Sequence, residues 1–169
     1  MSTGRIGKAW AVLGTVLDPE VPALSVRDLG IVRDVVEPAE GGELEIVLTP
    51  TYSGCPATEV IEQGVLEAIA QAGIGPARVR LQRAPAWTSD WISEEGRRKL
   101  RDYGIAPPGG TAPDATVPLR FVGRREAALA CPRCASTDTE RLSAFGSTAC
   151  KALYRCRACR EPFEHFKPI

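Results

Sequence analysis

Residues 44–71, LEIVLTPTYSGCPATEVIEQGVLEAIAQ, contain two hydrophobic periodicities, one after the other. From 44 to 48, leucine and isoleucine occupy every second position, which is typical of a half-buried strand. After Cys55-Pro56 the apolar residues recur at the spacing of an amphipathic helix. They are Val60, Ile61, Val65, Ala68 and Ile69. We therefore predict a strand, a loop and a helix that stops near Gly73.

The sequence on either side extends this pattern to a small α+β domain. A first amphipathic helix is predicted ahead of Asp18-Pro19, because the residue before a proline avoids the helical conformation. Its apolar residues are Ile6, Ala9, Trp10, Leu13, Val16 and Leu17. Residues 31–36 are predicted to form a hairpin with 44–48, and the alternation at 77–81 predicts a third strand. The order α-β-β-α-β predicts a mixed three-stranded sheet with helices on one face.

Charge and cysteine are distributed unevenly along the chain. Residues 119–169 carry 10 Lys and Arg against 5 Asp and Glu, whereas residues 1–118 carry 11 against 16. Five of the six cysteines also lie in the C-terminal part. Residues 106–118 contain four Pro and two Gly, which favours an extended connector. We predict one domain over 1–105, a linker over 106–118 and a second domain over 119–169. A long surface loop within a single domain is the alternative.

The C-terminal part contains two Cys-x-x-Cys pairs, CPRC (131–134) and CRAC (156–159), separated by 21 residues. Two residues between cysteines let one tight turn direct both sulfurs at a single ion, and two such turns complete a tetrahedral site. Because about fifty residues bury little core, a metal is the expected source of stability. We predict a four-cysteine zinc ribbon whose structural Zn²⁺ is bound by Cys131, Cys134, Cys156 and Cys159. Disulfides, which a reducing cytosol disfavours, and rubredoxin-like iron are the alternatives.

Cys55 is the only cysteine of the N-terminal part. Pro56 suits the first helical position, which places Cys55 at the N-cap, where unpaired backbone N–H groups and the helix dipole favour a thiolate. Gly54 permits a tight bend ahead of it. A reactive or metal-binding thiol is one interpretation of Cys55, and a small buried hydrophobic residue is the other.

Composition narrows the class of protein. Hydrophobic residues make up 44% of the chain and charged residues 25%, as in ordinary globular proteins. A formal net charge of zero gives no overall field toward nucleic acid or anionic membranes. No apolar run approaches a membrane span, and the first residues lack the apolar core of a signal peptide, so we predict a cytoplasmic protein. The single histidine, His165, supplies neither a di-iron site nor a His-centred triad, which argues against a catalyst acting alone.

Several motifs in this sequence resemble those of known families. DPEVP (18–22), DLGIV (28–32) and TPTYSGCP (49–56) resemble the ordered motifs of the iron–sulfur assembly family that includes SufT-like proteins. Further segments resemble the PaaD family, which is associated with the multicomponent phenylacetyl-CoA epoxidase of phenylacetate degradation. They are AWTSDWI (86–92), YGIAPP (103–108) and FGSTACK (145–151). The resemblance extends from Trp10 to Ile169.

The resemblance implies an accessory subunit rather than the oxygenating component. Such a subunit would help to mature or insert the metal centres of the epoxidase, whose reductase carries an iron–sulfur cluster and whose oxygenase carries a di-iron site. Cys55 then corresponds to the family's thiol and would bind iron or an iron–sulfur cluster transiently. The acidic motif positions are Asp18, Glu20 and Asp28. These carboxylates either line the Cys55 site or only stabilise turns by accepting backbone hydrogen bonds.

Three other residues have more than one interpretation. Thr49 lies in the same motif as Cys55 and is either part of the iron site or a strand-end residue. Cys150 lies six residues before Cys156, within FGSTACK, and is either an additional ligand for iron or a cluster, or a packed residue. His165 is predicted to be a surface residue rather than a ligand.

The resemblance implies that the other epoxidase subunits are partners, above all the iron–sulfur reductase. Because no apolar run approaches a membrane span, we expect no membrane partner. Two alternative functions stay open. The ribbon cysteines would hold iron and pass electrons in one, and the ribbon would bind nucleic acid in the other. Four thiolates around one divalent ion carry a net charge of −2, which reduces the basic excess of residues 119–169 from about +5 to about +3 and disfavours nucleic acid.

Overall fold

The structure is a computed structural model that describes residues 4–109 and 129–169. Residues 110–118 of the predicted linker and residues 119–128 of the predicted ribbon lie outside these ranges. The described helices include none that combines the length and the apolar character needed to cross a membrane.

The contacts within the chain divide it into two compact units. The first unit contains the described chain up to Trp87 together with Trp91–Gly96. The second contains Thr88–Asp90 and the described chain from Arg97 onward. Each unit is described below by itself.

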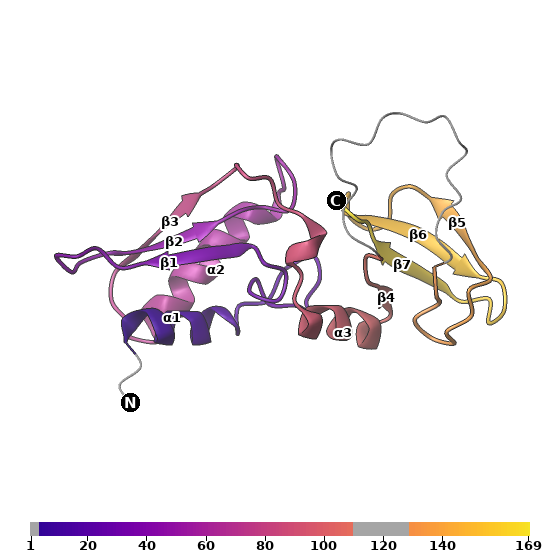
Figure 1. The fold of residues 1–169 in the computed structure, drawn as a ribbon, viewed down its shortest axis with the longest axis horizontal. Helices are drawn as coiled ribbons and strands as arrows, with labels where there is room; N and C mark the ends of the chain where they lie inside the picture. Colours follow the sequence, from indigo (N-terminus) through magenta and orange to yellow (C-terminus); the bar gives the residue numbers. More distant parts are fainter. Residues whose placement is uncertain (1–3, 110–128) are drawn as a thin grey trace. The chain divides into compact units, whose positions relative to one another are not determined.

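The first unit is the predicted mixed α+β domain (Figure 1). Its elements are α1 (Arg5–Leu13), β1 (Val32–Val36), β2 (Leu44–Leu48), α2 (Ala57–Gln71) and β3 (Ala77–Leu81). The three-stranded sheet has the order β1-β2-β3, in which β1 is antiparallel and β3 parallel to β2. α2 connects the parallel strands and contacts β3, while α1 contacts α2 and β1. The predicted order α-β-β-α-β is confirmed.

The core of this unit follows the predicted periodicities except at four apolar positions that are exposed, Ile6, Leu17, Val60 and Leu81. The apolar positions of β2 are almost fully buried, and the buried stripe of α2 consists of Ala57, Ile61, Val65 and Ile69. Val60, which was expected in that stripe, is 55% exposed. Val60 precedes the buried Ile61 by one residue, so its side chain is rotated by about 100° around the helix and lies outside the buried stripe. Leu17 is also 55% exposed, because α1 ends at Leu13 and does not reach it.

Two of the sequence motifs meet within the first unit. The Trp87 indole Nε1–H donates to the backbone carbonyl of Leu29 at 2.9 Å. Gly30 has φ +68°, and a Cβ atom built there would lie 2.5 Å from the carbonyl oxygen of Trp91. A residue with a side chain therefore does not fit at Gly30 without displacing the backbone. The DLGIV and AWTSDWI motifs thus have a packing role as well as any functional one.

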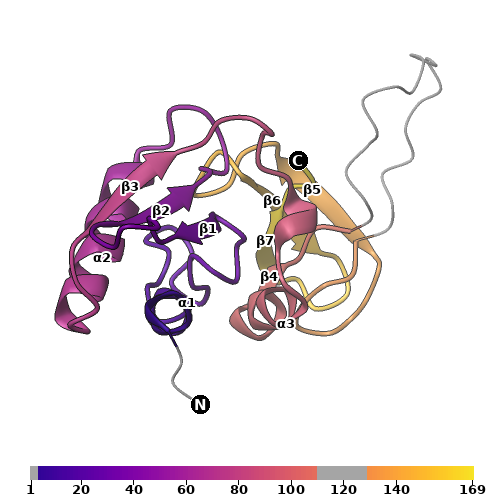
Figure 2. The same cartoon turned by 60° about the vertical axis from the view of Figure 1, so that its left-hand side comes forward.

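The second unit contains a four-stranded sheet (Figure 2). Its described helices and strands are η1 (Ser89–Trp91), α3 (Glu94–Tyr103), β4 (Ile105–Ala106), β5 (Thr139–Ser143), β6 (Lys151–Cys156) and β7 (Pro162–Phe166). The last residue of η1 and the first three residues of α3 belong to the first unit. The strand order is β4-β7-β6-β5, and only the β4–β7 pair is parallel. A small core joins the sheet to the cysteine turns. It consists of Ala106, Cys131, Ala152, Tyr154, Cys156 and Phe163.

The border between the units differs from the expected domain limits. Ile105 was expected to end the first domain and Ala106 to begin the linker, yet both form β4 and pair with Glu164 and His165 of β7. Both are buried, at 5% and 1% exposure. A two-residue strand has no periodicity to detect, so its partner across the sheet determines its place. The division into domains over 1–105 and 119–169 stays a prediction.

Candidate functional site

The four cysteines predicted to bind one ion lie together in the second unit. Their sulfur atoms are all within 4.8 Å of one another. Cys131 and Cys159 are separated by 3.8 Å between sulfurs, and Cys134 and Cys156 by 3.6 Å. Four sulfurs about 2.3 Å from a central ion would be about 3.8 Å apart, so the spacing fits a tetrahedral metal site. The disulfide alternative is wrong, because none of the six cysteines forms a disulfide.

The two cysteine turns have the same backbone geometry. The Cys131 N–H donates to the carbonyl of Ser136 at 2.9 Å, and the Cys156 N–H donates to the carbonyl of Glu161 at 3.0 Å. In each turn the residue after the second cysteine has a positive φ, 60° at Ala135 and 65° at Arg160. Each sequence pair therefore folds into an equivalent turn that presents two sulfurs to the same point.

Hydrogen bonds and mutual repulsion shift the thiol pKa values within this quartet. The backbone N–H of Cys159 donates to the Cys156 sulfur and lowers the pKa of Cys156 to about 7. A backbone N–H from Glu161 favours the Cys159 thiolate, but burial and the neighbouring sulfurs outweigh it and raise the pKa of Cys159 to about 12. Four thiolates cannot form side by side without a cation, so a divalent metal is the natural counter-charge.

Cys55 lies at the beginning of α2 and is partly exposed. Pro56 already has helical dihedral angles, φ −66° and ψ −22°, and the carbonyl of Cys55 accepts a hydrogen bond from the N–H of Thr58. Gly54 has φ +80°, a conformation that residues with a Cβ rarely adopt. The loop therefore turns sharply before Cys55. The N-cap of α2 is Pro56, so Cys55 lies one residue before the N-cap position that the sequence predicted for it. The thiol is partly exposed and is not sealed in the core.

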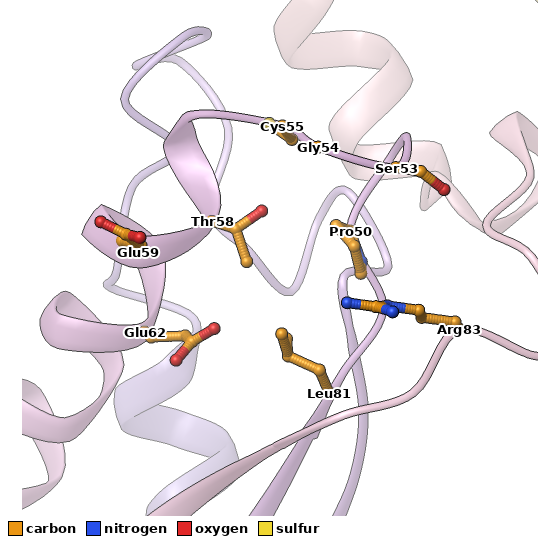
Figure 3. A pocket seen from close by; sticks show the side chains of 9 residues that line it. All are labelled: Pro50, Ser53, Gly54, Cys55, Thr58, Glu59, Glu62, Leu81 and Arg83. Atoms are coloured by element: carbon orange, nitrogen blue, oxygen red, sulfur yellow. The ribbon is translucent and has the colours of Figure 1, made fainter.

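A cavity of about 540 Å³ adjoins Cys55 (Figure 3). It is formed by the loop before α2, the first turns of α2 and the end of β3. The residues that line it are Pro50, Ser53, Gly54, Cys55, Thr58, Glu59, Glu62, Leu81 and Arg83. Figure 3 shows the Glu62 carboxylate and the Arg83 guanidinium on opposite sides, with Leu81 below. The cavity thus combines one thiol with groups of both charges.

The polar side chains that line this cavity were not among the residues predicted from the sequence. Thr58, Glu59 and Glu62 follow Cys55 by three, four and seven residues, the spacing that places side chains on one helix face. That spacing would have identified them. Arg83 joins the cavity from beyond β3, and no local pattern relates it to Cys55.

The acidic motif residues do not line this cavity. Asp18 is buried, and its Oδ1 accepts hydrogen bonds from the backbone N–H groups of Glu20 and Val21 at 2.9 and 2.7 Å. The Asp28 Oδ2 accepts from the N–H and the hydroxyl of Ser25 at 3.0 and 2.9 Å. These contacts are the turn and cap chemistry given above as one interpretation. A role of Asp18, Glu20 and Asp28 in binding iron stays a prediction.

Thr49 and Cys150 are both buried. The Thr49 hydroxyl has no hydrogen-bond partner within the described chain, which is uncommon for a buried polar group. The Cys150 sulfur lies 3.0 Å from the hydroxyl of Thr148 and does not belong to the quartet found among the described residues. Their predicted roles in handling iron stay untested by the geometry.

Sequence comparisons place both units in known families. Residues 8–80 match the family described as "Iron-sulfur cluster assembly protein", and residues 115–167 match "PaaD zinc beta ribbon domain". A solved structure from Bacillus anthracis, described as a domain of unknown function DUF59, has a TM-score of 0.52 and 26% identity to this chain. The match covers 57% of this chain and 91% of that one.

Two curated proteins are also similar. A protein of Escherichia coli, described as the D component of a "Putative 1,2-phenylacetyl-CoA epoxidase", is 48% identical over 165 residues, which covers 98% of this chain and 94% of that protein. A protein of Porphyromonas gingivalis described as "Fe-S protein maturation auxiliary factor" is 33% identical over 90 residues. That match covers 53% of this chain and 84% of the other.

Proposed function

The chain belongs to the PaaD family, and from this premise we propose that it is an accessory subunit of a phenylacetyl-CoA epoxidase that delivers iron or an iron–sulfur cluster to the epoxidase's metal centres. The observation that carries the proposal is the partly exposed Cys55 thiol beside a cavity of about 540 Å³. The similarity of residues 8–80 to iron–sulfur assembly proteins supports it. The substrate handled by the site is then the metal species itself.

Cys55 is suited to transient rather than permanent binding. Iron–sulfur clusters are held by four thiolates or by thiolates and imidazoles together. Cys55 is the only cysteine in the chain before Cys131. The other ligands of a bound cluster would therefore come from the donor or the recipient, which makes the complex open to exchange. The Cys55 thiol would release its proton to solvent as its sulfur binds iron, because the thiolate is the form that binds a metal.

The second unit has a separate role in this proposal. Cys131, Cys134, Cys156 and Cys159 would hold a structural Zn²⁺, since their spacing fits a tetrahedral four-sulfur site. Zn²⁺ in this site would cross-link the two cysteine turns and perform no redox chemistry. The ribbon is then available to contact other epoxidase subunits, among them the iron–sulfur reductase.

The proposal is tested by cluster transfer from the reconstituted protein to the apo-reductase of the epoxidase. We expect Cys55→Ser and Cys55→Ala to reduce the transfer rate at least tenfold, because both remove the thiolate. Ser53→Ala, which changes the same cavity and keeps the thiol, is the matched control and should transfer normally. Undiminished transfer by both Cys55 variants would remove Cys55 from the mechanism.

The same preparations identify the metal of the quartet. We expect one zinc ion per chain in wild type and Cys55→Ala, and loss of that zinc in Cys134→Ala. A reddish protein with ferric tetrathiolate absorption would instead favour the electron-transfer alternative, because Zn²⁺ is colourless.

A further inference from the structure

A second cavity, of about 340 Å³, lies beside the cysteine quartet in the second unit. Its described lining consists of Arg155, Cys156, Arg157 and Arg160, without an acidic residue. Guanidinium groups that share one concave surface repel one another, so an anion bound among them is stabilised by all of them. We infer that this arginine cleft, formed by Arg155, Arg157 and Arg160, binds carboxylate side chains of an acidic peptide segment in a partner protein. The inference does not depend on Cys55.

Two of the three guanidinium groups are held in position from one side. The Glu140 Oε2 accepts from Nε and Nη2 of Arg157 at 3.2 and 2.9 Å, while its Oε1 accepts from Nε and Nη2 of Arg155. Asp138 lies 3.8 Å from Nη1 of Arg157. A guanidinium group has five N–H donors, so each arginine keeps donors for a second carboxylate. The two side chains are 52% and 57% exposed, which leaves them accessible.

Arg160 is the member of the cleft that lacks an internal partner. It forms no hydrogen bond or ion pair with the residues that the structure describes, and it is exposed. Arg160 has a φ of +65° and follows the second cysteine of its pair, as Ala135 does in the other cysteine turn. The cysteine turn therefore fixes the backbone of this cationic residue at the lining of the cavity.

The chemistry of the cleft favours carboxylates. Arg forms paired, charge-assisted hydrogen bonds with carboxylates. Arg155 and Arg157 already share one carboxylate, that of Glu140, with each arginine donating to one of its two oxygens. Residues 129–169 carry 7 basic and 4 acidic side chains. Four thiolates around a divalent ion would reduce that excess to about +1. Such a unit lacks the charge that attracts a phosphate backbone, yet its arginines can bind a short acidic segment locally.

The experiment is fluorescence anisotropy of a labelled hexaglutamate peptide with the full chain. We expect wild type to bind the peptide and Arg160→Gln to weaken binding at least fivefold. Arg160→Gly should weaken it equally and keep the turn, because glycine favours a positive φ. The matched control is Arg80→Gln. Arg80 also pairs with a glutamate, Glu45, which Arg78 shares, but Arg80 belongs to the first unit and does not line this cavity.

Retained zinc in each variant verifies that the quartet is intact. Peptide binding that is equal in wild type and Arg160→Gly would overturn the inference. So would stronger binding of a single-stranded oligonucleotide that depends on Arg160, because the cleft would then recognise phosphate.

Discussion

Gly30 is the residue at which one added methyl group should destabilise the first unit most. It has φ +68°, and an added Cβ would lie 2.5 Å from the Trp91 carbonyl oxygen and 2.7 Å from the Trp91 Cβ. The left-handed conformation and the overlap together should cost about 2–4 kcal/mol in the free energy of unfolding of Gly30→Ala. Gly41 has a similar φ of +73° with nothing within 4 Å of an added Cβ, so Gly41→Ala should lose only about 1–2 kcal/mol. Urea denaturation of both variants checks the difference, and equal losses would contradict the contact with Trp91.

At the scale of the elements, β6 and β7 share a buried ion pair. Lys151 has a side chain that is 3% exposed, and its ammonium lies 2.9 Å from Oε2 of Glu164. Glu164→Gln would leave a buried ammonium without its counter-charge, and we expect a loss of about 3–5 kcal/mol. Lys151→Met combined with Glu164→Gln should recover most of that loss. Thermal unfolding followed by circular dichroism measures both, and a double variant as unstable as the single one would contradict this account.

The same ion pair predicts a pH dependence. Burial disfavours the ionised Glu164, but the Ser147 N–H and the Lys151 ammonium lower the pKa of its carboxyl below the usual value. A carboxyl with a lowered folded-state pKa adds stability that is present above its unfolded pKa of about 4.3 and is lost as the pH falls through the folded pKa. The second unit should therefore lose stability below about pH 4, and Glu164→Gln should remove part of that dependence.

Local periodicity was sufficient to predict most elements, whereas long-range contacts were not accessible in this way. The alternation at 44–48 and the apolar stripe of α2 arise within single elements, so they can be detected without the fold. The cysteine quartet was also predictable, because the spacing of each pair imposes one turn. By contrast, Arg83 reaches the Cys55 cavity from another element, and β4 is too short to have a period. The backbone hydrogen bonds of Asp18 and Asp28 likewise depend on the observed turn geometry.

At the scale of the whole molecule, metal removal should affect the two units differently. The core of the second unit includes Cys131 and Cys156, so the metal site and the packing stabilise each other. The first unit has its own core and contains all three tryptophans of the chain. Chelation with excess EDTA should therefore unfold the ribbon sheet and leave the tryptophan fluorescence of the first unit largely unchanged. The readouts are tryptophan emission and protease cleavage within residues 129–169.

Acid should reproduce the effect of the chelator. Metal binding requires thiolates, and the raised pKa of Cys159, about 12, means that its proton must be displaced on binding. Lowering the pH therefore favours the protonated thiols and weakens the metal site, so the apparent affinity should fall steadily from pH 8 to pH 6. Competition with a chromophoric zinc chelator over this range measures the change. An affinity independent of pH, or a ribbon that resists proteolysis without metal, would show that packing alone maintains the second unit.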